Sequence, residues 1–245
     1  MEDNERGGGS VGLLAGKAAI VTGASRGIGR AISCRFASSG ARVAGFARDA
    51  EQLDRTGRVV AAEGGTFLPR IVDVTSPEEV DKAVTEVADQ LGRIDILVND
   101  AAACLRGGLT ELSIQDYDMM IASNVNSAVY CCRAVWETMR SQGGGVIINV
   151  SSLSASAFTP GFAVYAATKG FMNTFTAALA TEGRKAGIRV YAIAPGYVRT
   201  ELLARVAPEV PGDKALGADD VAVAVEALCG PAHLYSSGEV HYLRR

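Results

Sequence analysis

Short apolar segments alternate with longer segments of helical periodicity from residue 17 onward, and this alternation constrains the fold more than any other feature. Several short segments are almost entirely apolar, which is typical of parallel strands covered by helices on both faces. The expected strands are Ala18–Thr22, Arg42–Phe46, Thr66–Ile71, Ile94–Val98, Val146–Val150, Ile188–Ile193 and Glu239–Tyr242. Repeated alternation of this kind requires right-handed crossovers. We therefore expect an α/β fold, a doubly wound parallel sheet of about seven strands with helices on both faces.

The clearest helical pattern runs from Pro77 to Leu91. Ser76 is suited to the N-cap, Pro77 to the first helical position, and Glu79 completes a capping box. The apolar positions fall on one stripe of the helix, as expected for a face that packs on a sheet. They are Val80, Ala83, Val84, Val87, Ala88 and Leu91.

Composition excludes several classes of function. Lys and Arg number 24 against 27 Asp and Glu, a net charge of −3, which is too balanced to predict a nucleic acid or an anionic membrane as partner. No apolar run reaches the length of a membrane span. The 5 cysteines are odd in number and form no CxxC, which favours reduced thiols and a cytoplasmic location. The 2 histidines, His233 and His241, are too few for a His-based metal site, and we expect no metal.

The first residues differ in character from the rest. Gly7-Gly-Gly-Ser10 is typical of flexible chain, so residues 1–15 are predicted to be a flexible leader. Residues 16–245 contain no internal linker and no repeat, and we expect them to form one domain.

A glycine-rich turn follows the first expected strand, in Thr22-Gly-Ala-Ser-Arg-Gly-Ile-Gly29. Gly23 allows the chain to leave the strand, Gly27 allows the backbone to approach a ligand, and Gly29 allows close packing of helix on strand. Free N–H groups at the start of the next helix attract a pyrophosphate. A plain tight turn is the alternative, but the strand–turn–helix context favours nucleotide binding.

Tyr165 and Lys169 stand at positions i and i+4 of a helical segment, so the phenol and the ammonium share a helix face. Ser151 and Ser152 end the preceding apolar strand, at the edge where open α/β sheets carry their active sites. Lys169 is expected to lower the pKa of the Tyr165 phenol, which is about 10 when free. Tyr165 would then donate a proton to a carbonyl oxygen held by a serine hydroxyl. The alternative is a packed tyrosine beside a solvated lysine.

In spacing and order these motifs resemble the short-chain dehydrogenase/reductase family over residues 16–242. The resemblance implies a single-domain Rossmann-type fold and an NADP-dependent oxidoreductase that acts on CH–OH groups. It assigns the catalytic roles to Asn124, Ser152, Tyr165 and Lys169, with the asparagine supporting a proton-relay water. Ser152 lies thirteen positions before Tyr165, as in the family, while Ser151 stays a rival. Asn124 could instead be a helix-kinking or capping amide.

The resemblance also implies NADP(H) as cofactor and a set of residues that contact it. Asp73 would meet the adenine amino group, although it could simply cap the following segment. The Val198 backbone and the Thr200 hydroxyl would hold the nicotinamide carboxamide. The full set is Gly23, Ser25, Arg26, Gly27, Ile28, Gly29, Arg48, Asp73, Val74, Asn99, Ala101, Tyr165, Lys169, Pro195, Gly196, Val198 and Thr200.

The end of the second strand bears on the choice between NAD and NADP. An enzyme that prefers NAD needs an acidic side chain there, but the position holds Ala47, followed by Arg48. In the resembling family, basic residues at the places of Arg26 and Arg48 hold the 2′-phosphate of NADP. Asp49 is the counter-evidence, and two merely solvated arginines are the alternative.

Three departures from the family pattern are visible. Asn99-Asp-Ala-Ala102 stands where the family has Asn-Asn-Ala-Gly, so that Asp100 adds a charge and Ala102 a methyl group. We expect local adjustment there and not loss of binding. The segment from Thr200 to Asp219 is short for a substrate lid. The C-terminus lacks the Asp-Gly-Gly tail that helps relatives to form tetramers, so homodimer and homotetramer both stay open.

These observations predict an NADPH-dependent carbonyl reductase that resembles 3-oxoacyl-(acyl carrier protein) reductases and converts a small-molecule ketone to a secondary alcohol. A cofactor-binding regulatory protein with little turnover is the alternative, and an interaction scaffold that binds no nicotinamide is a third reading. The intact catalytic set counts against the regulatory protein, and the departures count for it. The substrate would be chosen by the lid and by residues 104–109, which carry no motif.

Overall fold

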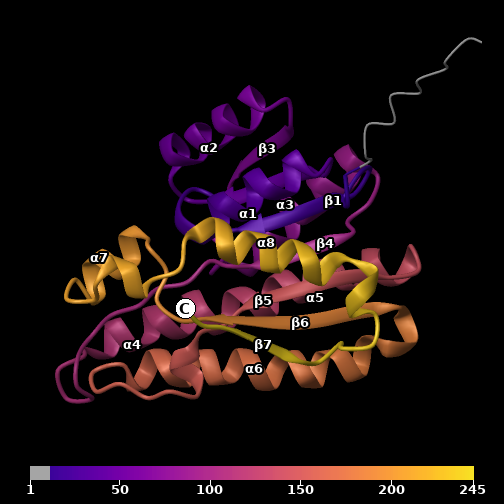
Figure 1. Ribbon diagram of the computed structural model, residues 1–245. Helices are drawn as coiled ribbons and strands as arrows, with labels where there is room; N and C mark the ends of the chain where they lie inside the picture. Colours follow the sequence, from indigo (N-terminus) through magenta and orange to yellow (C-terminus); the bar gives the residue numbers. More distant parts are fainter. Residues whose placement is uncertain (1–11) are drawn as a thin grey trace, which may run out of the picture.

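The computed structural model describes residues 12–245, and its centre is one parallel sheet (Figure 1). In this part of the chain the sheet has 7 strands in the order β3-β2-β1-β4-β5-β6-β7. The strands are β1 (Ala18–Thr22), β2 (Arg42–Ala47), β3 (Thr66–Ile71), β4 (Ile96–Asn99), β5 (Gly145–Val150), β6 (Ile188–Pro195) and β7 (Val240–Leu243). The predicted doubly wound α/β fold is confirmed, and the strand ends lie within about two residues of their predicted positions.

Helices cover both faces of the sheet, as Figure 1 shows. They are α1 (Gly27–Ser38), α2 (Ala50–Ala62), α3 (Pro77–Leu91), α4 (Ile114–Ile121), α5 (Ser127–Ser141), α6 (Ala163–Gly183), α7 (Glu201–Val206) and α8 (Ala218–Cys229). Helices α1, α2 and α8 pack on one face, and α3, α5 and α6 on the other. Each face therefore has its own apolar core.

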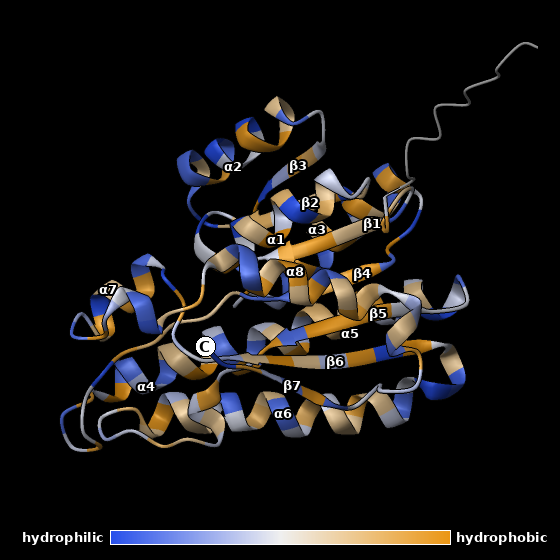
Figure 2. Cartoon of the chain, in the orientation of Figure 1, coloured by the Kyte–Doolittle hydropathy of each residue, from blue (hydrophilic) through white to orange (hydrophobic). Residues whose placement is uncertain are grey.

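The central strands β1 and β4 are apolar along almost their whole length because both of their faces are buried. Ala19 and Val21 of β1 belong to the core under α1 and α8, whereas Ala18 and Ile20 belong to the core under α3 and α5. All five residues of β1 are buried. Figure 2 shows the same arrangement as apolar central strands between helices that carry polar residues on their outer sides. Adjacent side chains of a strand point to opposite faces, so only a continuous apolar run satisfies both cores.

Helix α3 begins at the predicted residue, but Glu79 does not complete the predicted capping box. The Ser76 side chain accepts a hydrogen bond from the Glu79 N–H at 3.3 Å, and Pro77 is the first helical residue. The Glu79 carboxylate, however, accepts from the N–H of Asp73 at 2.9 Å. Glu79 thus fastens the helix to the chain just after β3, and its side chain helps to position Asp73.

The folded part of the chain begins earlier than predicted. Leu14 is 2% exposed and belongs to the core under α1, and its N–H donates to Ser39 at 3.1 Å. The prediction of a flexible leader therefore does not hold for residues 12–15, because the apolar side chain of Leu14 is buried in the core. Residues 1–11 of the predicted leader lie outside the described residues.

The sheet order places a crevice at its centre. From β1 the chain winds outward to β3, and from β4 it winds the other way to β7, so the connections diverge between β1 and β4. Ligands of doubly wound sheets bind at this point, outside the carboxyl ends of the strands. Within residues 12–245, no helix is long and apolar enough to cross a membrane. In the same range, no three His, Cys, Asp or Glu side chains lie together as potential metal ligands.

Candidate active site

A cleft of about 410 Å³ opens at the carboxyl edge of the sheet, where the strand connections diverge. Segments that follow β1, β2, β3, β4 and β6 line it. The lining residues are Gly23, Ser25, Arg26, Gly27, Ile28, Phe46, Ala47, Arg48, Asp49, Val72, Asp73, Val74, Thr75, Asp100, Ala101, Ala102, Ala103, Ser123, Thr200, Glu201, Leu202 and Arg205. A second hollow of about 570 Å³ beside the start of α6 is lined by none of the predicted site residues.

The glycine turn has the geometry of a phosphate cradle. Gly23 and Gly27 have φ of +68° and +55°, in the left-handed region that favours glycine. A Cβ on Gly29 would lie 2.4 Å from the carbonyl oxygen of Gly23, so only glycine fits there. Arg26 at the N-cap of α1 makes no capping hydrogen bond with its side chain. Because the start of α1 is left uncapped by that side chain and opens on the cleft, these residues fit a pyrophosphate group.

Tyr165, Ser152 and Lys169 come together at the end of β5. Tyr165 lies in the first turn of α6, and the Ser152 hydroxyl, just after β5, lies close enough to its phenol to lower the pKa of Tyr165. The Lys169 ammonium lies 5.8 Å from the centre of the Tyr165 ring and donates to the Val150 carbonyl at 2.7 Å. The predicted helix face that joins phenol and ammonium is therefore formed.

The two candidate serines are distinguished by their neighbours. Ser151 is buried, and its hydroxyl donates to the backbone carbonyl of Lys169 at 3.1 Å. It therefore holds α6 to the end of β5. Ser152 accepts from the Ser154 N–H at 3.1 Å and faces the phenol of Tyr165. Of the two, Ser152 is the one that lies next to Tyr165.

Burial dominates the ionisation of this cluster. It raises the pKa of Tyr165 above its ordinary value, as does Cys104, while the hydrogen bond with Ser152 opposes the shift. Burial also lowers the pKa of Lys169 to about 8, against the effect of Asp100. In the protein without a bound ligand, desolvation raises the pKa of the phenol, and the lowering predicted from Lys169 is not seen. At neutral pH Tyr165 is therefore a neutral phenol.

Asn124 lies in a π-helical turn, Ala122–Asn126, between α4 and α5. Its amide accepts from the Ala103 N–H at 2.7 Å, donates to the Ala103 carbonyl at 2.8 Å, and donates to the Thr168 hydroxyl at 3.0 Å. The side chain thus ties the loop after β4 to the residue next to Lys169. The asparagine thus occupies a helix irregularity, as one reading of the sequence held, and its role in catalysis stays a prediction. Irregular turns of this kind are frequent at functional sites.

The expected adenine end of the cleft contains Asp73 and Val74. The Asp73 carboxylate accepts from the Thr75 N–H at 3.0 Å and from its hydroxyl at 2.8 Å. Although burial raises the pKa of Asp73, the bonds from Thr75 and the charge of Arg48 bring it below its ordinary value. Arg48 is exposed and lies 3.8 Å from the Asp73 carboxylate. Asp73 therefore caps the following turn, as the alternative held, and still lines the cleft.

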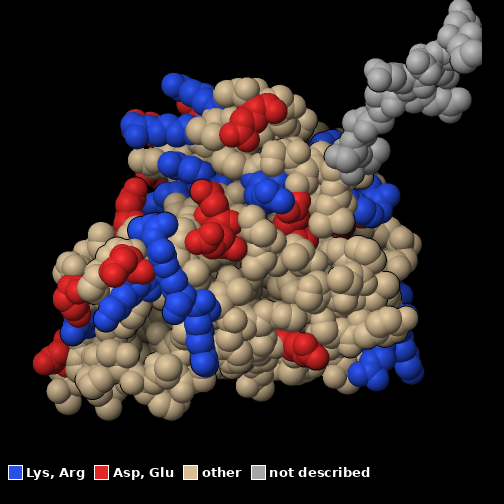
Figure 3. Space-filling view, in the orientation of Figure 1, with Lys and Arg blue, Asp and Glu red and all other residues tan. Residues whose placement is uncertain are grey.

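The acidic residues near the two arginines have defined partners. Asp49 is the N-cap of α2, and its carboxylate accepts from the Gln52 N–H at 3.0 Å. The Arg26 guanidinium lies 3.3 Å from Glu201, the first residue of α7. Figure 3 shows acidic and basic side chains close together in the region of α7. The Asp49 carboxylate is thus used as the cap of α2. Arg26, by contrast, already forms an ion pair at the rim of the cleft.

The Pro-Gly loop after β6 leads into α7. Pro195 ends β6, and the Gly196 N–H donates to Leu243 of the neighbouring strand at 3.0 Å. Val198 is buried, and Thr200 lines the cleft beside Gly27. The Thr200 hydroxyl caps α7, accepting from the Leu203 N–H at 3.3 Å. The predicted nicotinamide contact would therefore use a hydroxyl that also begins a helix.

Asn99 does not line the cleft. It is 5% exposed, and its amide donates to Asn149 of β5 at 2.9 Å. It ties the ends of two strands together inside the sheet. Ala101, by contrast, lines the cleft, and its N–H donates to the Thr22 hydroxyl at 3.0 Å.

Several lining residues were not predicted from the sequence. Arg205 and Leu202 reach the cleft from α7, whose sequence carries no motif. Cys104, in the loop that follows β4, lies just beyond the lining residues; it is 3% exposed, and burial raises the pKa of its thiol to about 11, against the charges of Lys169 and Arg205.

Comparisons with known proteins agree with this geometry. A family profile described as short chain dehydrogenase matches residues 17–211. Gluconate 5-dehydrogenase of Gluconobacter oxydans (strain 621H) is 37% identical over 193 residues, which cover 79% of this chain and 75% of that protein. Two solved structures are also similar. The 3-ketoacyl-(acyl-carrier-protein) reductase of Brucella melitensis, complexed with NADH, has a TM-score of 0.88 at 30% identity, covering 94% of this chain and 97% of that chain. A short chain dehydrogenase of Burkholderia cenocepacia J2315, in complex with NADP, has a TM-score of 0.87 at 31% identity, covering 95% and 98%.

The family profile spans most of the chain, and the matching relatives share its fold nearly from end to end. The glycine cradle lines the cleft at the carboxyl edge of the sheet, where such proteins bind their dinucleotide. The Ser152, Tyr165 and Lys169 cluster lies at the same edge, after β5 and at the start of α6, but does not itself line that cleft. The chain belongs to the short-chain dehydrogenase/reductase family of NAD(P)-binding oxidoreductases.

Proposed function

We propose that the protein is an NADPH-dependent carbonyl reductase that converts a ketone of the 3-oxoacyl type, or a related one, to a secondary alcohol. The observation that carries this proposal is the placement of the buried Tyr165 phenol beside Ser152 and 5.8 Å from the Lys169 ammonium, where burial raises the pKa of the phenol and keeps it neutral. A neutral phenol is a proton donor, and a donor is what ketone reduction requires at the oxygen.

Each residue has a defined task in this mechanism. The glycine turn, with Arg26 and Arg48, would hold NADPH, which when bound would supply a hydride for the carbonyl carbon. The Ser152 hydroxyl holds the carbonyl oxygen, and the Tyr165 phenol gives that oxygen its proton. Lys169 stabilises the phenolate that is left behind, because a nearby ammonium favours the charged form. Asn124 keeps the loop after β4 and the Lys169 turn of α6 in place, through Ala103 and Thr168.

Three features support NADPH over NADH. Ala47 ends β2 without a carboxylate that could accept from a ribose 2′-hydroxyl. Arg26 and Arg48 both line the cleft. Asp49, the acidic residue two places after Ala47, is engaged as the cap of α2. Solved relatives with NADH and with NADP both exist, so the preference rests on these residues.

The cofactor preference is tested by kcat/KM for NADPH and NADH on the wild type and on Arg48→Ala. A charge-assisted contact is worth about 1.5–3 kcal/mol, so the variant should lose at least about tenfold with NADPH and little with NADH. Arg55→Ala is the matched control, because Arg55 is an exposed arginine of α2 that pairs with Glu51. A wild-type preference for NADH would contradict the assignment.

The reaction is tested by NADPH consumption with acetoacetyl thioesters, simple diketones and oxidised sugar acids. The last group is included because one relative is a gluconate 5-dehydrogenase. Turnover of at least one class supports the enzyme over a regulatory protein with the same fold. Cofactor binding without turnover across all three classes would favour the regulatory protein.

We also propose that residues 16–245 act as one domain, in the cytoplasm, on a small molecule, as a homodimer or homotetramer. Family membership and the balanced charge of the chain support this view. Sedimentation velocity on the purified protein distinguishes the two assemblies, and a monomer at micromolar concentration would contradict both.

A further inference from the structure

Asp100 is held at the foot of the glycine turn. It follows β4 directly, and its N–H donates to the Thr22 hydroxyl at 3.0 Å. The same hydroxyl accepts from the next residue, Ala101, at 3.0 Å. Thr22 ends β1, immediately before the turn. The backbone at Asp100 is therefore fixed against the strand from which the phosphate cradle emerges.

The carboxylate of Asp100 points into this cradle. Its Oδ2 lies 3.2 Å from the place that a Cβ on Gly23 would occupy, and 2.8 Å from the corresponding place on Gly29. The Gly29 N–H stabilises the ionised carboxylate. An ionisable carboxyl group thus occupies the base of the site whose geometry fits a pyrophosphate, and the family pattern has a neutral asparagine at this position.

The charged groups around Asp100 do not neutralise it fully. Lys169 of α6 acts on it, but the Lys169 ammonium donates to the carbonyl of Val150. Arg26 of α1 is paired with Glu201 at the rim. The other titratable neighbours, Tyr165 and Cys104, have pKa values that burial raises, so both are neutral at pH 7. Burial raises the pKa of Asp100 to about 7, and Lys169 opposes the shift.

We propose that Asp100 makes dinucleotide binding proton-linked: when a pyrophosphate enters the glycine turn, the Asp100 carboxylate takes up one proton from solvent and becomes a neutral acid. Two like charges in a partly desolvated site repel strongly, and protonation of one removes the repulsion. By linkage, the affinity for the dinucleotide then falls as the pH rises through neutrality, by at most about tenfold per pH unit for one proton. This inference rests on the proposed function only in requiring that the turn binds a pyrophosphate.

The test is calorimetry of NADPH and NADH binding at pH 7 in two buffers of different ionisation enthalpy, which counts the protons taken up. NADPH carries a 2′-phosphate that itself titrates near about pH 6, so the readout is the difference between wild type and Asp100→Asn. We expect a fractional uptake in the wild type, for both cofactors, that Asp100→Asn removes. Asp49→Asn is the matched control, because Asp49 lines the same cleft but caps α2, and its uptake should equal that of the wild type.

Affinity measured at pH 6, 7 and 8 gives a second readout. The wild type should lose at least about threefold in NADH affinity between pH 6 and 8. Asp100→Asn should lose clearly less, and what it still loses should fall between pH 7 and 8, where Lys169, with a pKa of about 8, begins to lose its proton. Asp100→Ser is the second variant should the asparagine fail to fold. Equal proton uptake in the wild type and the variants would overturn the inference while leaving the proposed function intact. Absence of any dinucleotide binding by the wild type would overturn both.

Discussion

The two ends of strand β4 carry the same residue type in opposite states. Asp95 lies just before the strand, and its carboxylate accepts from the Arg93 guanidinium at 2.6 and 2.7 Å and from the Ala18 N–H at 2.9 Å. Although burial raises it, these bonds and the charge of Lys17 bring the pKa of Asp95 below its ordinary value. Asp100, just after the strand, has its pKa raised by burial. The same side chain is held as an anion at one end and is poised to be neutral at the other.

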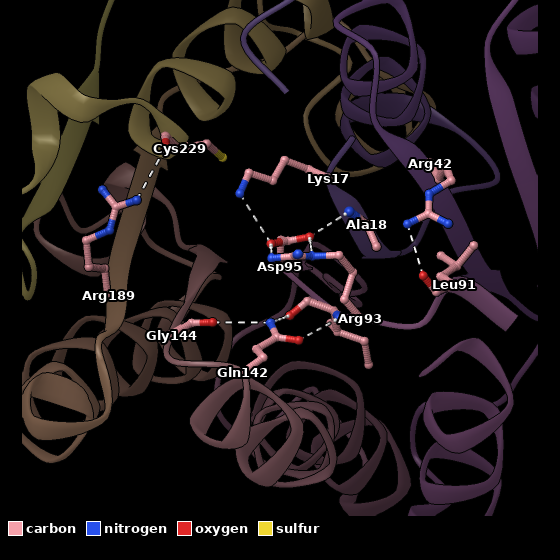
Figure 4. A network of polar contacts seen from close by, with 11 residues as sticks. Lys17, Ala18, Arg42, Leu91, Arg93, Asp95, Gln142, Gly144, Arg189 and Cys229 are labelled. Carbon is pink, nitrogen blue, oxygen red and sulfur yellow. Dashed lines mark hydrogen bonds and ion pairs between the residues drawn. The ribbon is translucent and has the colours of Figure 1, made fainter. Parts of the chain in front are cut away.

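The surroundings explain the difference. At the amino edge, side chains satisfy the ends of the strands, as Figure 4 shows for the network around Asp95 and Gln142. Gln142 donates to the carbonyl of Gly144 at 3.2 Å, and Arg42 donates to that of Leu91 at 3.0 Å. At the carboxyl edge, glycine turns and uncapped helix ends leave groups that a ligand can satisfy. The amino edge is built for stability, and the carboxyl edge for binding and chemistry.

The largest expected effect is the loss of turnover on Tyr165→Phe. Deleting only the transferable proton should lower kcat by about 10³-fold or more while NADPH affinity stays within a few-fold. The unfolding free energy should barely change, because the ring remains. Tyr235→Phe, at a residue that is 99% exposed, is the control in the same steady-state assay. A near-normal kcat in Tyr165→Phe would contradict the mechanism proposed for the carboxyl edge of the sheet.

Lys169→Ala should have the next largest effect, with losses in both kcat and NADPH affinity of about 10-fold to 100-fold. The ammonium stabilises the phenolate, and it is expected to reach the ribose hydroxyls as well. Lys17→Ala, at the amino edge, removes a half-exposed ion pair to Asp95 and should change neither property. Kinetics and fluorescence titration of NADPH compare the two lysines. Unchanged NADPH affinity in Lys169→Ala would count against its double role.

Asp95→Asn should lower stability without lowering activity. It replaces charge-assisted hydrogen bonds from Arg93 by weaker neutral ones, at a cost of about 2 kcal/mol. For a chain of this size, that corresponds to a Tm lower by about 4–8 °C. Asp100→Asn should shift stability by less than about 1 kcal/mol, since it removes a buried charge and not a satisfied one. Equal losses of unfolding free energy in Asp95→Asn and Asp100→Asn, measured by urea unfolding, would contradict the difference between the two edges.

The smallest effect is a pH dependence of the Asp95 contribution. Since the folded-state pKa of Asp95 lies below its unfolded value of about 4, the ionised form is favoured in the folded protein. The stabilisation is therefore fully present above about pH 4 and is lost as the pH falls through the folded-state pKa. The difference in unfolding free energy between wild type and Asp95→Asn should shrink steadily below pH 4. A difference that stays constant down to pH 2 would show that ionisation of Asp95 is not its source.

The sequence predicted the fold well because both faces of the central strands are buried, so that these strands are continuous apolar runs. It also predicted that Tyr165 and Lys169 meet, because four residues on a helix fix their relative position. It could not predict that Arg26 meets Glu201, since 175 positions separate them and only the folded lid brings them together. Nor could it predict that Asn99 turns inward to Asn149, because both sides of a strand end are available to a polar side chain.

The π-helical turn at Ala122–Asn126 restricts how this protein can change in length. Such a turn amounts to one residue inserted into an α-helix, and deletion of Ser123 would restore a regular helix. Each residue of an α-helix adds a rotation of roughly 100°, so the deletion would turn Asn124 away from Ala103 if Val135 kept its place in the core. Inserting or deleting one residue between α4 and α5 therefore displaces either the core side chains of α5 or the residues that contact the loop at the cleft. Functional variants of this protein should therefore differ in length in the loops on either side and keep the length of this helical segment constant.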